Sequence, residues 1–175
     1  MRHLIPFVAL AAILLTFSGA AGKEVTKMDA MTVESPAFKD NSTIPKQYTC
    51  DGKDINPPLV FRNIPPGTRS LALIVDDPDA PAGIWVHWVL WNIDPGTTEI
   101  RENSVPTGAL EGRNDFRRTI YGGPCPPSGT HRYFFKLYAL DTMLNIDRNS
   151  TKQDLEKAMK GHILGEARTV GLYKR

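Results

Sequence analysis

The sequence predicts a mainly β domain, and three observations support this fold class. From Met31 onward, short apolar runs alternate with turn-rich stretches, which is the spacing typical of β domains. Glycine and proline are frequent, with 14 of each, while 41% of the residues are hydrophobic, so a loop-rich but folded chain is expected. Residues 23–175 would form a single domain of ordinary size, long enough to bury a core.

The first 22 residues are predicted to be a secretory signal peptide. Met1–His3 gives a short basic start, Leu4–Phe17 is apolar and uncharged, and small residues follow, with cleavage expected after Ala20, Ala21 or Gly22. An uncleaved membrane anchor is the alternative, but the apolar run is shorter than the roughly 20 residues that span a bilayer. We therefore expect a protein exported to the periplasm or the extracellular space, with no transmembrane segment in the mature chain.

Six strands are expected from the apolar runs. They cover Met31–Glu34, Leu59–Phe61, Ser70–Val75, Val86–Ile93, Tyr133–Leu140 and Arg168–Tyr173. The run from 86 to 93 is apolar on both alternating faces, and the run from 133 to 140 carries Lys136 as its only charge. Strands of this kind are covered on both sides, so these two are predicted to be the central strands.

One helix is expected to begin near residue 150. Ser150 and Gln153 have the spacing of a capping box. The apolar stripe that follows at helical spacing consists of Leu155, Ala158, Met159, His162 and Ile163. The helix is expected to end or break at Gly161 or Gly165. His162 is interpreted as a packed or partly exposed helix residue rather than as a ligand.

Charge and cysteine content limit the partners and the compartment. The formal net charge is +2, and no run of Lys and Arg forms the concentrated basic surface that nucleic-acid binding needs. Cys50 and Cys125 allow two interpretations, because export permits a disulfide between them and two buried thiols are the alternative. The triplets that begin at Asn41 and Asn149 match the N-glycosylation acceptor pattern.

Candidate site residues lie in or beside the predicted strands. Asp76-Asp77-Pro78-Asp79-Ala80-Pro81 follows one strand, and a solvated acidic turn is the simpler interpretation of this stretch alone. His87 lies inside an apolar strand, where a buried ring needs a partner, and His131 and Tyr133 share one face of another. If these strands lie close together, Asp77 and the three rings can surround one cavity. Their imidazole and phenol donors suit a small anion.

Two enzyme interpretations of the same residues stay open. Two histidines and an aspartate also suit a zinc or iron site, although no His-x-x-x-His or Cys-x-x-Cys spacing is present. Cys125 and His131 would form the nucleophilic pair of a hydrolase. Gly-x-Ser-x-Gly is absent, and Ser128 has no feature of a nucleophile elbow.

Three ordered motifs resemble signature segments of the phosphatidylethanolamine-binding protein family. They are Asp77-Pro78-Asp79-Ala80-Pro81, Trp85-Val86-His87-Trp88, and Gly122-Gly123-Pro124-Cys125-Pro126-Pro127 followed by His131-Arg132-Tyr133-Phe134-Phe135. The resemblance covers about residues 31–175 and is closest to the prokaryotic Raf-kinase-inhibitor-like branch. It implies a β-sandwich in which a large central sheet packs on a smaller one, with a few peripheral helices. It also implies a pocket at one end that binds phosphate-like groups, including the phosphoethanolamine head of a lipid.

The resemblance also assigns roles by motif position. The implied ligand-binding residues are Asp77, His87, His131 and Tyr133, with Pro126 on the pocket wall. Cys125 stands where animal members have glycine. The long C-terminal helix of animal members, with any ligand contact it makes, has no counterpart because this chain stops soon after its last predicted strand.

The motifs, the predicted signal peptide and the candidate site residues support one functional expectation and leave alternatives open. We expect an exported, non-enzymatic binding protein without a cofactor or metal, whose ligand is phosphate, phosphoethanolamine or a phospholipid headgroup. Such a protein would regulate or inhibit a protease or a kinase and would contact a membrane peripherally. A protease is favoured because Raf-type kinases are cytosolic. The alternatives are a hydrolase or metal-dependent enzyme that uses the same residues, and a surface interaction protein with a vestigial pocket.

Overall fold

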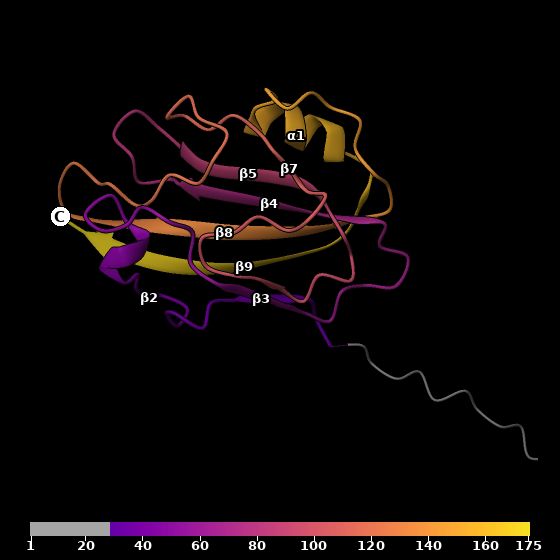
Figure 1. Ribbon diagram of the computed structural model, residues 1–175, viewed down its shortest axis with the longest axis horizontal. Coiled ribbons are helices and arrows are strands. Elements are labelled where there is room, and N and C mark those ends of the chain that lie inside the picture. Colours follow the sequence, from indigo (N-terminus) through magenta and orange to yellow (C-terminus); the bar gives the residue numbers. More distant parts are fainter. Residues whose placement is uncertain (1–28) are drawn as a thin grey trace, which may run out of the picture.

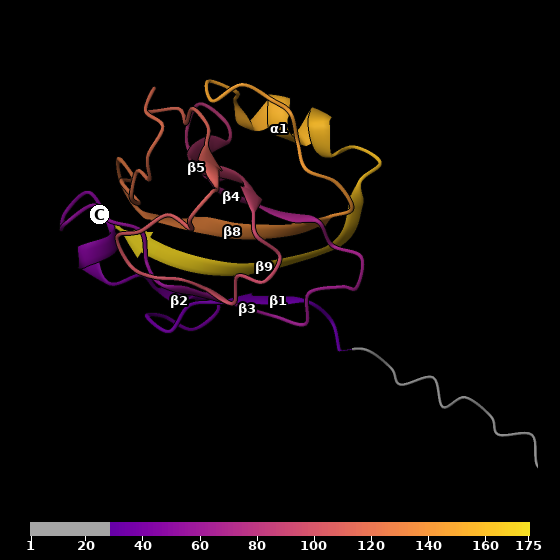
Figure 2. The ribbon, with the colours of Figure 1, turned by 45° about the vertical axis from the view of Figure 1, so that its right-hand side comes forward.

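Within residues 29–175, two β-sheets and one α-helix form three layers (Figure 1, Figure 2). The computed structural model describes residues 29–175, so the predicted signal peptide and its cleavage site lie outside the described residues. The two-sheet arrangement confirms the predicted mainly β fold. Within residues 29–175, we find no helix with the length and apolar character needed to cross a membrane.

The strands form a small sheet and a large one. The small antiparallel sheet has the order β1 (Thr32–Glu34), β3 (Leu59–Arg62) and β6 (Glu99–Ile100). The large sheet has the order β2 (Ser42–Thr43), β9 (Ile163–Lys174), β8 (Thr130–Leu140), β4 (Ser70–Asp77), β5 (Trp85–Ile93) and β7 (Leu110–Glu111). Its neighbouring strands are antiparallel, except that β2 runs parallel to β9. A short 3-10 helix, η1 (Lys46–Tyr48), follows β2.

All six predicted strands are present, as β1, β3, β4, β5, β8 and β9. The short strands β2, β6 and β7 were missed because each has two residues inside a turn-rich segment. Of the two strands predicted to be central, β8 lies in the middle of the large sheet beside β4, whereas β5 lies next to the two-residue edge strand β7. β5 is covered on both faces because the small sheet lies on one side and the helix on the other.

Helix α1 (Lys152–Met159) is shorter and begins later than predicted. Its N-cap is Thr151, whose side chain accepts a hydrogen bond from the Asp154 backbone, so the capping box is not formed by Ser150 and Gln153. The predicted continuation through His162 and Ile163 was wrong. The helix stops at residue 159, Gly161 takes a φ of +86°, and Ile163 already begins β9.

Two apolar cores hold the layers together, and strand β4 contributes to both. Its residues Leu71, Leu73 and Val75 face the core between the two sheets. Ala72 and Ile74 face the second core, beneath α1. Alternate residues of a strand point to opposite faces, which is why this strand is apolar throughout its buried middle.

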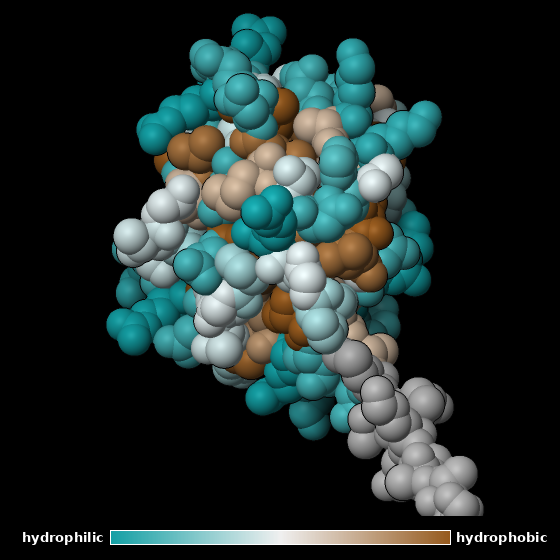
Figure 3. Space-filling view, turned by 90° about the vertical axis from the view of Figure 1, so that its right-hand side faces the viewer, coloured by the Kyte–Doolittle hydropathy of each residue, from teal (hydrophilic) through white to brown (hydrophobic). Residues whose placement is uncertain are grey.

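Exposed apolar side chains at the far end of the molecule are dispersed. Met143, Ile163 and Leu164 are each more than two-fifths exposed. Figure 3 shows the end opposite the C-terminus, where apolar residues form separate patches among polar ones. This pattern is ordinary for a protein surface.

Candidate functional site

A cavity of about 270 Å³ lies at the end of the large sheet where β4 finishes and β8 begins. This end of the molecule also carries the C-terminus (Figure 1). Because β4 pairs with both β5 and β8, three strands bring their side chains to one place. The cavity is lined by Asp77, Ala80, Pro81, Ala82, Trp85, His87, Phe116, Cys125, Pro126, Pro127 and His131.

His131 and Asp77 form a buried pair at this cavity. The His131 Nδ1 lies 2.7 Å from the Asp77 Oδ2, so the ring donates its Nδ1 proton to the carboxylate. Asp77 accepts a second hydrogen bond at Oδ1, from the backbone N–H of Asp79 at 2.8 Å. The carboxylate therefore fixes the ring orientation and leaves the His131 Nε2 for a ligand.

A surface ion pair braces the turn that carries Asp77. Arg132 binds Asp79 in a bidentate manner, with Nε 2.8 Å from Oδ2 and Nη2 2.6 Å from Oδ1. These bonds lower the pKa of Asp79 from 3.8 to about 2. The turn after β4 is thereby tied to β8, so the predicted solvated acidic turn is instead part of the cavity wall.

His87 is held by a backbone carbonyl rather than by a carboxylate. Its Nδ1 lies 2.6 Å from the Gly122 oxygen, and since a carbonyl only accepts, Nδ1 carries the proton. Burial lowers the pKa of His87 below 6.5, because the charged ring would lose its hydration. The ring is therefore neutral at pH 7, and its Nε2 is the atom left for a ligand.

Tyr133 lies against the site but does not line the cavity. Its ring meets the His87 ring edge to face, with centroids 5.2 Å apart. The hydroxyl is buried and has no hydrogen-bond partner among residues 29–175. Burial, and then the charge of Asp77, raise the pKa of Tyr133, so the phenol stays protonated.

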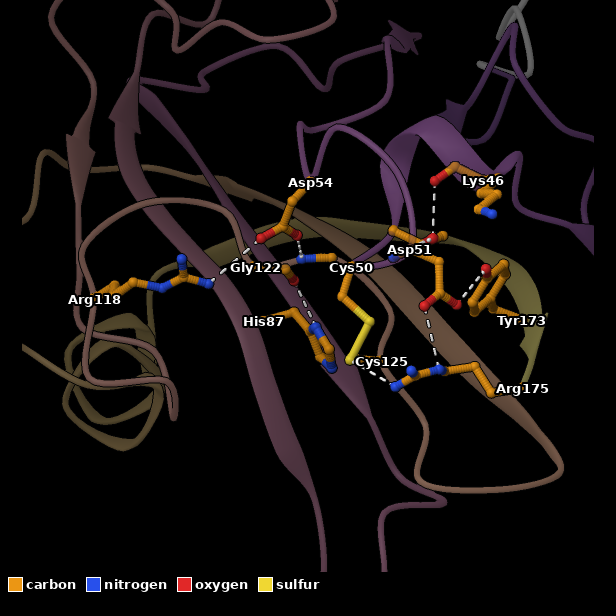
Figure 4. Close-up of a disulfide and its surroundings, with 12 residues drawn as sticks. Lys46, Cys50, Asp51, Asp54, His87, Arg118, Gly122, Cys125, Tyr173 and Arg175 are labelled. Atoms are coloured by element: carbon orange, nitrogen blue, oxygen red, sulfur yellow. Dashed lines mark hydrogen bonds and ion pairs between the residues drawn. A yellow bond between two sulfur atoms is a disulfide. The ribbon is translucent and has the colours of Figure 1, made fainter.

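The cavity wall beyond β5 depends on a disulfide between Cys50 and Cys125, whose Cα atoms are 5.4 Å apart (Figure 4). This bridge selects the disulfide over the two buried thiols. It also rules out the proposed Cys125–His131 nucleophilic pair, because no free thiol exists. Next to Cys125, Pro126 lines the cavity as the resemblance implied.

Sequence reasoning missed an aromatic wall of this cavity. Phe116 meets both Trp85 and His87 edge to face, at centroid distances of 5.4 and 5.3 Å. The loop that carries Phe116 is held by Asn114, whose amide donates to the His87 carbonyl and to the Ile120 carbonyl. Trp85 belongs to one of the three motifs, whereas no sequence signal marked Phe116, which lies outside the predicted strands and helix.

The imidazole rings of His87 and His131 are held in fixed orientations and face a cavity whose walls are mostly apolar. In the part of the chain that the structure describes, no group of three or more His, Cys, Asp or Glu side chains is placed to hold a metal ion. Because the Nδ1 of neutral His87 carries the proton, its Nε2 accepts and can bind the O–H group of a small oxyanion, while the Nε2 of His131 is left for the same ligand. Apolar walls strengthen such contacts because they exclude water.

Comparisons with known proteins give a family. Residues 34–174 match the family model of the phosphatidylethanolamine-binding protein. A UPF0098 protein of Methanothermobacter thermautotrophicus is 51% identical over 150 residues, covering 83% of this chain and 99% of that protein. A UPF0098 protein of Pyrococcus horikoshii is 46% identical over 184 residues, covering 100% of this chain and 91% of that protein.

Solved structures agree with this match. The crystal structure of a phosphatidylethanolamine-binding protein homologue from Chlamydia trachomatis is 40% identical, with a TM-score of 0.81, and the match covers 83% of this chain and 98% of that one. Escherichia coli YbcL, described as a member of the mammalian family, is 31% identical with a TM-score of 0.79, covering 84% and 99%. The chain belongs to the phosphatidylethanolamine-binding protein family, which confirms the resemblance drawn from its motifs.

Proposed function

We propose that this protein is an exported, non-enzymatic binding protein whose cavity holds a small anion with a phosphate-like group. The observation that carries the proposal is that His87 and His131 line one cavity with their Nδ1 atoms already engaged. The two Nε2 atoms are left to meet the ligand oxygens. Family membership supports a binding role.

The hydrogen-bonding state of the rings supports a phosphate ester or free phosphate over a carboxylate as the ligand. Neutral His87 presents an accepting Nε2, while the Nδ1 of His131 donates to the Asp77 carboxylate and leaves its Nε2 for the ligand. A monohydrogen or dihydrogen phosphate carries an O–H group that can donate to the accepting Nε2 of His87. A carboxylate can only accept.

The proposal also includes the compartment to which the protein is exported and the partner that it contacts there. The signal-like composition of residues 1–22 supports export, and the disulfide is typical of an oxidising compartment. A ligand held at the end of the sandwich, between proline-rich rim segments, leaves the rim free to contact a protease or the headgroups of a membrane.

Thermal unfolding with and without ligand tests the proposal. Inorganic phosphate and phosphoethanolamine should each raise the Tm of the wild type, because a ligand that binds only the folded state stabilises it. His87→Ala should remove this shift. His162→Ala is the matched control, since His162 pairs with Asp141 far from the cavity and should leave the shift unchanged.

The outcomes separate the source of the phosphate group. A shift with phosphoethanolamine that exceeds the shift with phosphate would favour a lipid headgroup, which vesicles of phosphatidylethanolamine should then reproduce in a sedimentation assay. Equal shifts in the wild type and His87→Ala would contradict the proposal.

A further inference from the structure

A second feature lies on the outer face of the large sheet, away from the cavity. Helix α1 covers this face over β4 and β5, where Leu155 and Met159 pack. None of the described helices covers the part formed by β8 and β9 (Figure 2). A hollow of about 370 Å³ opens there, lined by Lys136, Tyr138, Glu166, Ala167 and Arg168.

The centre of this uncovered face is a phenylalanine surrounded by cations. Phe134 is half-buried, and the charged groups of three side chains lie 5.4 to 5.7 Å from its ring centroid, those of Arg132, Lys136 and Arg168. We call these four residues and Tyr138 the basic face. Cation–π contacts hold the charged groups in place, so less side-chain freedom is lost when a partner binds them.

Like charges lie directly opposite each other on the basic face. Lys136 of β8 pairs in register with Arg168 of β9, an arrangement that is unfavourable between exposed strands. Lys136 is compensated by Asp76 at 2.8 Å, but Asp76 is shared with Lys152 at 2.6 Å. Lys152 also has Glu156 at 3.6 Å, whereas the ion pair with the shared Asp76 is the only one that Lys136 forms among residues 29–175.

Arg168 differs from the other two cations of the basic face, Arg132 and Lys136, because no carboxylate among residues 29–175 compensates its charge. Among residues 29–175 it forms no ion pair, although the carboxylate of Glu166 lines the same hollow. Arg132, by contrast, is neutralised by Asp79. A carboxylate supplied by a partner between Arg168 and Lys136 would remove the repulsion between them and complete the charge balance.

The shape of the basic face favours an extended segment over a small ion. Arg132, Phe134, Lys136 and Tyr138 alternate along one face of β8. At about 3.3 Å per residue the row is about 20 Å long. The hollow beside Tyr138 can take a side chain, and burial raises the pKa of Tyr138 to about 12, so its hydroxyl remains a donor.

We propose that the basic face binds an acidic, extended segment of a partner protein, with one carboxylate between Arg168 and Lys136 and an apolar side chain in the hollow beside Tyr138. The residues that would contact the carboxylate and the apolar side chain, Lys136, Tyr138 and Arg168, do not line the cavity, so the proposal does not depend on the proposed function. Its ligand class follows from charge complementarity and from the length of the face.

Fluorescence anisotropy with a synthetic peptide tests this proposal. The probe is a fluorescein-labelled 12-residue peptide that repeats Glu-Asp-Leu, compared with the peptide in which each acid is replaced by its amide. At low salt the wild type should bind the acidic peptide and not the amide form. Arg168→Glu should weaken binding by about tenfold, because repulsion replaces attraction.

Matched variants separate this surface from general charge. Lys160→Glu makes the same kind of charge reversal at an exposed lysine after α1 and should leave the affinity unchanged, as should His87→Ala. Phe134→Leu should reduce the affinity to a smaller extent than Arg168→Glu, and circular dichroism of each variant establishes that it is folded.

Three results would overturn the proposal. One is no binding of the acidic peptide to the wild type, and another is equal weakening by Arg168→Glu and Lys160→Glu. The third is Arg168-dependent sedimentation with vesicles that contain 30% phosphatidylglycerol in the absence of peptide binding, since a membrane would then be the occupant.

Discussion

Asp76 and Asp77 are neighbours at the end of β4, and both are buried, with exposed fractions of 1% and 3%. They point to opposite faces of the sheet. Asp77 faces the cavity and binds His131, whereas Asp76 faces α1 and binds Lys136 and Lys152. The comparison shows that the face of the strand, and not the residue type or its burial, decides which carboxylate is available to function.

The two carboxylates also differ in what they hold together. Asp76 joins β4 to both β8 and the first turn of α1, so its partners are structural elements. Asp77 accepts from a ring and from its own turn, so its partner is a side chain that lines a cavity. Mutations on the two faces should therefore separate stability from binding.

The largest expected effect on stability follows from Asp76→Ala. Without this carboxylate, Lys136 and the buried Lys152 lose their shared partner, and the free energy of unfolding should fall by about 3–5 kcal/mol. Urea denaturation measures the change. Phosphate should still protect the folded fraction, and a loss of protection equal to that in Asp77→Asn would contradict the separation of the two faces.

The second effect comes from the cavity side. Replacing both Cys50 and Cys125 by serine should lower the free energy of unfolding by about 2–4 kcal/mol, because the bridge closes a long loop. It should also weaken phosphate binding, since Pro126 follows Cys125 directly in the cavity wall. Urea denaturation and the phosphate-induced Tm shift measure the two effects, with the oxidised wild type as the control.

Unchanged phosphate protection in the double variant would contradict a role of the bridge in the cavity wall. The residues on either side give a reason to expect a local effect. The backbone N–H of Gly123 donates to Asp54 at 2.6 Å, and Gly129 and Arg175 exchange backbone hydrogen bonds. Reduction would therefore release the segment between them without unfolding the sheet.

Asp77→Asn should have a smaller effect on stability than Asp76→Ala, and a larger effect on phosphate binding. An amide replaces one acceptor of a buried pair, which should cost about 1–3 kcal/mol of unfolding free energy. The phosphate-induced Tm shift should be lost, because His131 no longer has a carboxylate that fixes its tautomer. A retained shift would show that His131 does not need Asp77 to hold the ligand.

The sequence allowed the main residues of the cavity to be predicted, because they lie in strands and proline-rich turns with strong local signals. Asp77, His87 and His131 were expected to meet, and the pairing of β4 with β5 and β8 brings them together. The helix start was displaced by one residue because Ser150 and Thr151 are both good caps. Only the contacts of Asp154 decide between them.

Other features had no local signal. The role of Asp76 depends on Lys136 and Lys152, which lie 60 and 76 residues away in the chain. The aromatic wall depends on Phe116, which Asn114 positions through hydrogen bonds to other segments. Contacts of this kind arise from sheet order and loop packing, which periodicity does not determine.

The smallest effect is a pH dependence that belongs to the cavity face alone. Burial lowers the pKa of His87 below 6.5 in the folded protein, so as pH falls below 6.5 the unfolded chain takes up its proton first. The contribution of this residue to stability is therefore present above pH 6.5 and is lost as pH falls through the lower, folded-state pKa.

In His87→Gln this part of the pH dependence should be absent, whereas Asp76→Asn should retain it. The difference between urea denaturation curves of each variant and the wild type, measured from pH 7.5 to 5, isolates the effect. Parallel pH profiles for the wild type and His87→Gln would mean that the cavity does not desolvate this ring.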